Sequence, residues 1–336
     1  MTKVLAPPRL ADVARLARVS AVTVSRALRF PDTVSLAARE RIASAVEATG
    51  YVPNRIAGSL ASSRSNVVAM IIPSIRNSLF AATVQALADT LKQRGHAMIL
   101  GESGYEPSDE EAMIEAFLAQ RPCAIVLHNT AHTARARTML ARSGIPVIET
   151  GDLVRSPVDS VVAFSNASAG KAMTLHLAKR GCRNIAFVSL PVRQSGRALQ
   201  RRRGYLRALR VMGSVVARHR IVESPGSFEG GARALVQLLD TDPAIDGVFF
   251  AGDVFAVGAV LEAQRRGWPV PDRVAIAGFD DLEIAAQLTP ALTTMDVHRG
   301  RIGNEAATII LDRLDGRNLA PRRIDVGFSI LHRAST

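Results

Sequence analysis

The sequence predicts an α/β protein in which a small helical head precedes a larger region built from two doubly wound lobes. Residues 9–50 show only helical apolar spacing, whereas apolar runs of strand length begin at Val67 and alternate with amphipathic stretches. The 336 residues also exceed the usual size of one domain. We therefore expect a head over 1–53, a linker over 54–65 and a two-lobed region over 66–336.

Three short helices are expected in the head. They are Leu10–Ala17, Ala21–Leu28 and Leu36–Ala48. In the first, Leu10, Val13 and Ala17 recur at the spacing of one helix face. Pro31 ends the second helix, and Gly50 supplies the stop of the third.

Seven apolar runs follow the head, and each is short enough for one strand. They are 67–72, 97–100, 124–127, 146–150, 184–190, 247–250 and 274–279. Continuous runs of Val, Ile and Ala predict parallel strands that are covered on both faces. About 270 residues are too many for one compact sheet, so two lobes with a cleft between them are expected.

Charge is unevenly distributed along the chain. The 42 Lys and Arg against 30 Asp and Glu leave a net charge of +12. Residues 1–65 hold ten Lys or Arg and four acids, so this fifth of the chain carries +6, half of the excess. Such a local concentration favours a nucleic-acid-binding module over a merely well-solvated surface.

Cysteine usage and hydropathy point to the cytoplasm. Cys123 and Cys182 lie in or beside apolar runs, which predicts buried free thiols in a reducing compartment. No apolar run approaches the roughly 20 residues that span a bilayer. The first residues contain too short an apolar core for a secretion signal. We expect a cytoplasmic protein with no membrane partner.

Motifs of catalysis and metal binding are absent or incomplete. The stretch NASAGKA over 166–172 contains Gly-Lys, but Ser165 and Ala172 stand where a P-loop needs Gly and Ser or Thr. Neither a nucleophile elbow nor a dinucleotide fingerprint occurs. His128 and His132 follow a strand without a third ligand nearby, so loop or cleft-edge histidines are expected there. We expect no enzymatic activity, cofactor or metal.

The first two helices have the features of a helix-turn-helix. Ala14 provides the small residue that a steep helix crossing requires, and Val24 anchors the second helix. That helix then offers Thr23, Ser25 and Arg26 to a major groove, where side chains near a helix N-terminus reach base edges.

The longer string LADVARLARVSAVTVSRAL, followed by VSLAARERI and GYVPNRIAGSLA, resembles the DNA-binding head of the LacI/GalR family of transcriptional regulators. The resemblance continues to about Phe328 and so covers nearly the whole chain. It implies base and phosphate contacts for Thr23, Ser25 and Arg26. The main base-reading positions would be Ala21 and Val22, whose apolar side chains limit readout to contacts such as thymine methyl groups.

The same resemblance assigns a DNA-binding role to the linker. Asn54 matches a backbone contact, and 54–62 matches a hinge helix that orders on operator DNA. Ala57 belongs to the DNA-contacting positions of this hinge, and Leu60 matches a leucine that wedges into the minor groove. The resemblance further implies that a dimer binds the two halves of a pseudo-palindrome. We expect a dimer and not a tetramer, because no heptad repeat follows the last strand.

The two-lobed region is similar to type I periplasmic sugar-binding proteins, a fold that the family shares. A sugar-acid carrier would need a secretion signal and would lack the head. Family positions that face the ligand correspond to Asn77 and Phe80 at the cleft edge, to Arg201, and to Asp253 and Asp280.

Other positions depart from the common family pattern and suggest the ligand class. Arg299 would place a second guanidinium beside Arg201, and paired guanidinium groups suit a carboxylate or phosphate. Together with Glu149, Asp152 and Phe228, it makes the chain similar to the gluconate-operon repressors of the family. Gluconate or a close sugar acid (2-ketogluconate or 6-phosphogluconate) is the expected effector. The alternatives are a neutral sugar or other metabolite, with Arg299 a solvated residue at the start of the last helix.

Overall fold

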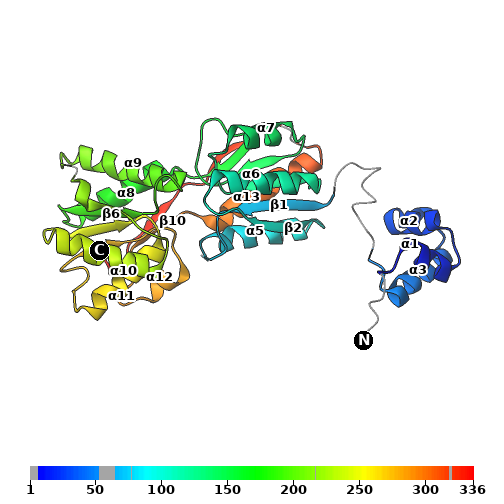
Figure 1. Cartoon of the computed structure of the whole chain (residues 1–336), viewed down its shortest axis with the longest axis horizontal. Helices are drawn as coiled ribbons and strands as arrows, with labels where there is room; N and C mark the ends of the chain where they lie inside the picture. Colours follow the sequence, from blue (N-terminus) through cyan, green and yellow to red (C-terminus); the bar gives the residue numbers. More distant parts are fainter. Residues whose placement is uncertain (1–6, 53–64, 77, 216, 318–319) are drawn as a thin grey trace. The chain divides into compact units, whose positions relative to one another are not determined.

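The chain folds as two compact units, Met1–Ser65 and Asn66–Thr336 (Figure 1). The computed structural model describes residues 7–52, 65–76, 78–215, 217–317 and 320–336. Within these ranges, every helix is too short or too polar to pass through a bilayer.

The first unit contains three helices around a small apolar core. They are α1 (Leu10–Ala17), α2 (Ala21–Arg29) and α3 (Leu36–Thr49), with a short 3₁₀ turn at Pro31–Thr33 between the last two. Val13, Val24 and Ile42 are buried where the helices meet. The predicted helices are confirmed to within one residue at each end, because Pro31 and the left-handed Gly50 stop them as expected.

The second unit begins with a lobe built on a six-stranded parallel sheet of order β11-β5-β4-β3-β1-β2. Its strands are β1 (Val67–Ile72), β2 (Ala97–Glu102), β3 (Ala124–Leu127), β4 (Val147–Glu149), β5 (Ser160–Ala163) and β11 (Arg323–Asp325). The helices are α5 (Ala81–Lys92), α6 (Pro107–Ala119), α7 (Ala134–Arg142) and α13 (Arg299–Leu314). We call this part lobe 1.

Lobe 2 is built on a four-stranded parallel sheet of order β7-β6-β8-β9. Its strands are β6 (Ile185–Ser189), β7 (Ile221–Glu223), β8 (Gly247–Phe250) and β9 (Ala275–Ala277). The helices are α8 (Asn166–Lys179), α9 (Gly196–Val211), α10 (Phe228–Thr241), α11 (Asp253–Arg265) and the short α12 (Glu283–Gln287). A separate antiparallel pair joins β10 (Thr294–Asp296) and β12 (Ser329–Leu331).

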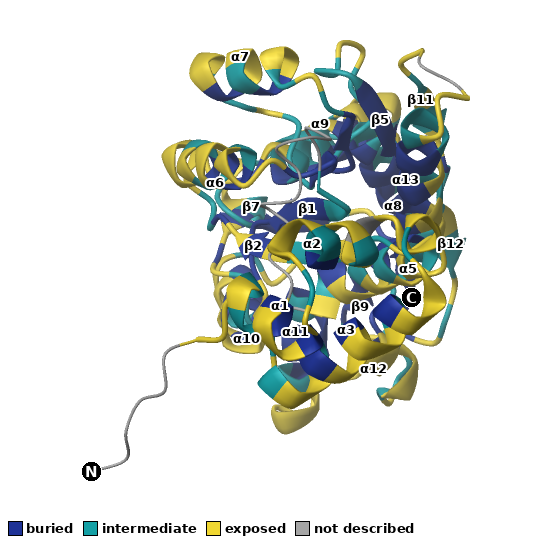
Figure 2. Ribbon diagram, turned by 90° about the vertical axis from the view of Figure 1, so that its right-hand side faces the viewer, coloured by how far each residue is buried: buried dark blue, intermediate teal, exposed yellow. Residues whose placement is uncertain are grey.

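Helices cover both faces of each sheet. In β1, Val68 and Met70 pack in one apolar cluster with α5 and α13, while Ala69 and Ile71 pack in another with α6 and α7. The central strands β1, β3, β4 and β5 are buried, while the outward faces of α6 and α7 are largely exposed (Figure 2). Alternate residues of a strand point to opposite faces, so apolar residues at every position require two covering layers. The predicted pair of doubly wound lobes is confirmed.

The chain passes between the lobes more than once within the second unit. β5 of lobe 1 leads into α8 of lobe 2, and β10 leads back into α13 of lobe 1. One apolar cluster accordingly contains residues of both lobes, among them Phe80 and Phe249. The carboxyl ends of the strands from both sheets therefore come together at the boundary between the lobes, which is where open α/β sheets bind ligands.

Candidate functional site

In the first unit, α1 and α2 form a helix-turn-helix. Arg18, with φ of 55°, closes the turn after α1, and the Ser20 hydroxyl accepts a 3.0 Å hydrogen bond from the Thr23 backbone N–H at the start of α2. Such an N-cap fixes where the helix begins and therefore which of its side chains face outward.

The side chains that α2 offers to a partner differ in accessibility. Ala21 and Arg26 are exposed, and Val22 is 67% exposed, which is unusual for a valine in a small domain. Thr23 and Ser25 are half-buried, and the Thr23 hydroxyl hydrogen-bonds the Ser20 hydroxyl at 2.8 Å. The predicted contacts Asn54, Ala57 and Leu60 lie outside the described residues.

In the second unit, a narrow cavity lies between the two lobes. Its free volume is about 20 Å³, room for a single water. The lining side chains come from both lobes: Leu79, Thr83, His128, Thr150, Gly151, Phe164, Arg197, Arg201, Asp280, Val297, Arg299 and Ile302. Arg201, Asp280 and Arg299 were predicted, and the fold brings these three together from separate parts of the sequence.

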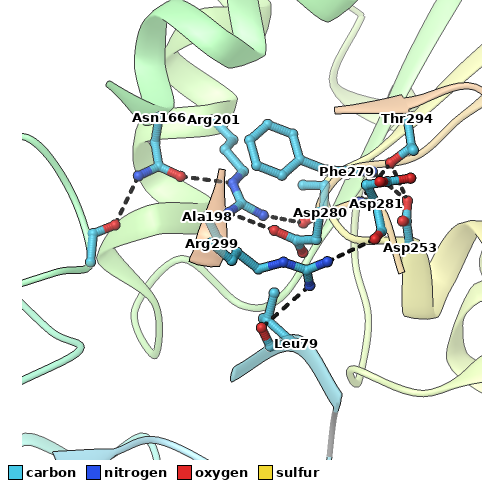
Figure 3. A network of polar contacts seen from close by, with 12 residues as sticks. Leu79, Asn166, Ala198, Arg201, Asp253, Phe279, Asp280, Asp281, Thr294 and Arg299 are labelled. Carbon is cyan, nitrogen blue, oxygen red and sulfur yellow. Dashed lines mark hydrogen bonds and ion pairs between the residues drawn. The ribbon is translucent and has the colours of Figure 1, made fainter. Parts of the chain in front are cut away.

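Arg201 is held on the lobe 2 side by three acceptors (Figure 3). Its Nε donates to the Asn166 side-chain oxygen at 2.9 Å, and one terminal nitrogen donates to the Ala251 carbonyl at 2.8 Å. The other terminal nitrogen lies 3.5 Å from the Asp280 carboxylate. The guanidinium carbon lies 3.6 Å from the centre of the Phe279 ring. Arg201 is therefore fixed in one orientation by hydrogen bonds and a cation–π contact.

Arg299 connects the two lobes. From the start of α13, its guanidinium donates to the Leu79 carbonyl of lobe 1 at 3.3 Å and to the Asp281 carbonyl of lobe 2 at 2.7 Å (Figure 3). It is half-buried. A solvated residue at a helix start would make neither contact, so the geometry favours the cavity role over that alternative.

Arg197, which was not predicted from the sequence, also enters the cavity. Its guanidinium carbon lies 5.4 Å from the centre of the Phe80 ring, and it donates no hydrogen bond to any residue that the structure describes. Burial and the neighbouring Arg201 lower its pKa to about 10. Arg197 precedes Arg201 by one helical turn, and this i, i+4 spacing was the available signal for it.

His128 and Phe80 form the lobe 1 wall facing these arginines. Their rings meet edge to face at 4.6 Å, and His128 Nδ1 lies 3.2 Å from the Thr150 hydroxyl. Burial, followed by Arg197 and Arg201, holds the pKa of His128 well below its usual range, so the imidazole is neutral. The charged side chains that line the cavity are therefore three guanidinium groups and the Asp280 carboxylate.

Asp253 does not line the cavity, although it was predicted to. Its carboxylate is wholly buried and accepts from the backbone N–H groups of Phe279 and Leu282, both at 2.7 Å, and from the Thr294 hydroxyl at 2.6 Å. Burial raises its pKa to about 7. These bonds hold the loop in which Asp280 takes a φ of 107°, so Asp253 supports the position of Asp280 from behind.

Glu149 lies in a separate buried cluster of lobe 1. Its carboxylate is 3.3 Å from His132 Nε2, and His132 Nδ1 is 2.7 Å from Glu110. Burial opposes the charge of His132, but its hydrogen bond to Glu110 and the nearby Glu149 carboxylate outweigh it and raise the pKa to about 9. Glu149 is thus engaged by a histidine inside the lobe and does not reach the cavity.

Two further predicted residues, Asp152 and Phe228, are also outside the cavity lining. Asp152 accepts from the backbone N–H and the side-chain amide of Asn166, both at 3.0 Å, and so acts on Arg201 through Asn166. Phe228 is exposed at the start of α10 and lines a groove with α11. Asn77 is not among the described residues.

Comparisons with known proteins identify the class. The profile described as "Bacterial regulatory proteins, lacI family" matches residues 9–54, and that described as "Periplasmic binding protein-like domain" matches residues 174–336. The HTH-type transcriptional regulator GntR of Pseudomonas aeruginosa is 37% identical over 336 residues, covering 100% of this chain and 97% of that protein. GntR of Escherichia coli is 35% identical over 323 residues, covering 96% and 97%.

A solved structure shows the same architecture. The crystal structure of a LacI-family transcriptional regulator from Silicibacter pomeroyi superposes with a TM-score of 0.92 at 33% identity, covering 98% of this chain and 99% of that one. The chain belongs to the LacI family of bacterial transcriptional regulators. It is therefore a DNA-binding regulator and not an enzyme, and the expected resemblance to gluconate-type repressors is confirmed at the level of sequence.

Proposed function

We propose that the protein is a repressor that binds a pseudo-palindromic operator as a homodimer and is controlled by gluconate or a closely related sugar acid. The observation that carries the ligand class is the charge of the cavity. Arg197, Arg201 and Arg299 line it against the single lining carboxylate of Asp280. Guanidinium groups bind carboxylate and phosphate in a bidentate manner, whereas a neutral sugar would leave this positive excess unbalanced.

Coupling between ligand and DNA follows from the position of the cavity. The cavity has room for a single water, so a sugar acid held by Arg201 of lobe 2 and Arg299 of lobe 1 needs the lobes to move apart. Binding therefore changes the relative populations of their open and closed arrangements. We expect this change to alter operator affinity by roughly 5- to 150-fold, the usual range of allosteric coupling.

The test measures operator binding with matched ligands. The chain's own upstream fragment, with a fluorescent label, is titrated with protein in the presence of gluconate, glucose or no addition. We expect gluconate to change the apparent Kd and glucose, which has similar size but no charge, to leave it unaltered. Equal effects of the two sugars would remove the sugar-acid assignment. A failure to bind any upstream fragment would remove the operator proposal.

The groove between α10 and α11 is the surface that we assign to the dimer. It has a volume of about 730 Å³, with Phe228, Ala232, Val236 and Leu261 along it and both Arg and Glu side chains at its edge. An apolar strip with mixed edge charges is self-complementary under a two-fold axis. Sedimentation equilibrium should give a dimer, and Leu261→Asp should give a monomer. A wild-type monomer would contradict this assignment.

A further inference from the structure

The most uneven charge distribution of the chain lies outside the head. Residues 160–222 span 63 positions between Asp159 and Glu223 and contain neither Asp nor Glu. They contain 13 cationic residues: Lys171, Lys179, Arg180, Arg183, Arg193, Arg197, Arg201, Arg202, Arg203, Arg207, Arg210, Arg218 and Arg220. All 30 Asp and Glu of the chain therefore lie outside this segment, which alone carries +13 of formal charge against a net charge of +12 for the whole chain.

Internal contacts account for only some of these cations. Arg197 and Arg201 line the cavity, Arg202 pairs with Glu223, and Arg220 pairs with Asp242. The rest make no ion pair with any acid in the described part of the chain. Most of them are exposed on or near α8 and α9: Lys179, Arg180, Arg183, Arg193, Arg203, Arg207, Arg210 and Arg218.

On α9 the exposed arginines form a stripe. Arg203, Arg207 and Arg210 follow one another at i, i+4 and i+7, which places them on one face over about 10 Å of helix. The opposite face carries the buried Gly204, Tyr205, Ala208 and Leu209. The stripe therefore points directly away from the core of lobe 2.

α8 extends this stripe sideways. The two helices cross closely, because a Cβ added at Gly204 of α9 would lie 2.6 Å from the Lys171 backbone nitrogen of α8. Figure 1 shows α8 and α9 side by side on one side of lobe 2. On α8, Lys179 is exposed and Lys171 is half-buried, with its backbone at the crossing with α9. We call these five residues, Lys171, Lys179, Arg203, Arg207 and Arg210, the α8–α9 basic face.

Like charges at i, i+4 destabilise a helix, so the face lowers stability unless it meets an anion. Protein interfaces place apolar and aromatic side chains at their centre and are poor in lysine. Membrane-surface helices need an apolar face to insert. On the described α8 and α9, the one large apolar side chain that is mostly exposed is Val211, at the end of α9. A cationic surface without apolar residues at its centre is complementary in charge to the phosphates of duplex DNA.

We propose that the α8–α9 basic face binds the sugar-phosphate backbone of duplex DNA beyond the operator sequence that the head reads. Membership of the LacI family already places the chain on DNA, so the phosphate polyanion is present whenever the repressor is bound. This contact is independent of base sequence. It adds affinity on long DNA and adds nothing on a duplex that ends at the operator.

The test compares two DNA lengths with the full-length protein. One duplex carries only the operator, and the other carries the same operator at the centre of about 150 base pairs, one persistence length. The variant is Arg203→Gln/Arg207→Gln/Arg210→Gln. We expect it to bind the long duplex about 10-fold more weakly than wild type. The slope of a plot of log Kd against log salt concentration should fall by up to about 3, since each lost phosphate contact lowers this slope by roughly 0.9. Binding to the short duplex should be unchanged.

A matched control removes the same charge from lobe 1. Arg135, Arg137 and Arg142 are exposed on α7, and Arg135→Gln/Arg137→Gln/Arg142→Gln should behave as wild type on both duplexes. If both triple variants lost the same affinity for the long duplex, the effect would come from net charge alone, and the proposal would be overturned. An unchanged affinity of the α9 variant for the long duplex would also overturn the proposal. If that variant lost binding to poly-glutamate instead, the face would be assigned to an acidic protein. If the wild-type protein failed to bind the short duplex, that result would contradict the operator proposal and not the proposal for the α8–α9 basic face.

Discussion

Two arginines one turn apart on α9 show how local contacts set the role of a residue. Arg201 has protein acceptors for its Nε and for both terminal nitrogens, whereas Arg197 has none among the described residues. Keeping a half-buried guanidinium without an acceptor costs free energy, and an anionic ligand would recover it. Arg197 is therefore the cavity side chain whose donors are available to a ligand. Arg201 mainly provides a positive charge in a fixed position.

Arg197→Gln should accordingly separate ligand affinity from stability. Loss of a charge-assisted hydrogen bond of about 1.5–3 kcal/mol corresponds to roughly 10- to 100-fold weaker gluconate binding. The melting temperature without ligand should stay the same or rise, since an uncompensated charge is removed. Titration calorimetry and thermal scanning measure the two quantities. Arg202→Gln, whose side chain pairs with Glu223 on the outside of α9, is the control and should leave both unaltered.

The sequence placed a side chain in the cavity correctly where its position in the fold decides that place. Asp280 and Arg299 reach the cavity because they follow strands that end there, and Arg201 reaches it from the second turn of α9. Asp253 and Glu149 do not, because each carboxylate is engaged by partners far away in the sequence, such as Thr294 and His132. A single sequence does not contain those pairings, and this is why the two carboxylates could not be placed in advance.

At the scale of elements, the apolar runs located seven strands: the longer β1, β2 and β6, and also the short β3, β4, β8 and β9. The prediction failed to include β5, β7, β10, β11 and β12, which have three or four residues each. β11, for example, pairs with β5 across some 160 residues of sequence, and its exposed residues carry no apolar pattern. Strands of this kind exist because a neighbouring strand supplies hydrogen bonds, so periodicity alone does not reveal them.

The crossing of α8 and α9 is an element-scale feature with a direct consequence. A Cβ at Gly204 would lie 2.2 Å from the Ala167 carbonyl, a backbone atom that has no room to yield. We expect Gly204→Ala to lower the free energy of unfolding by about 1–3 kcal/mol through overpacking. Gly196→Ala, at the exposed start of the same helix with no atom within 4 Å, should be neutral or stabilising. Urea unfolding of both variants checks this, and equal stabilities would show that the helices do not cross tightly there.

At the scale of the whole second unit, the lobes are joined by a side chain of the cavity itself. Arg299 donates to a carbonyl of each lobe, Leu79 and Asp281, so the residue that we propose to bind the ligand also favours the closed arrangement. A ligand shifts such an equilibrium only by its difference in affinity for the two arrangements. In our proposal the ligand carboxylate takes Arg299 donors away from these carbonyls, so binding shifts this equilibrium.

Arg299→Met keeps the length of the side chain but removes both donors. Without ligand, amide exchange should become faster at residues 78–83 and 279–283, where the two carbonyl partners lie. Gluconate affinity should fall by at least about 10-fold, because a charge-assisted bond to the carboxylate is lost. Arg94→Met removes an exposed pair with Asp315 within lobe 1 and serves as the control. If exchange at the two segments were unchanged while affinity fell, Arg299 would contact the ligand without joining the lobes, and the coupling to DNA would have to pass through another contact.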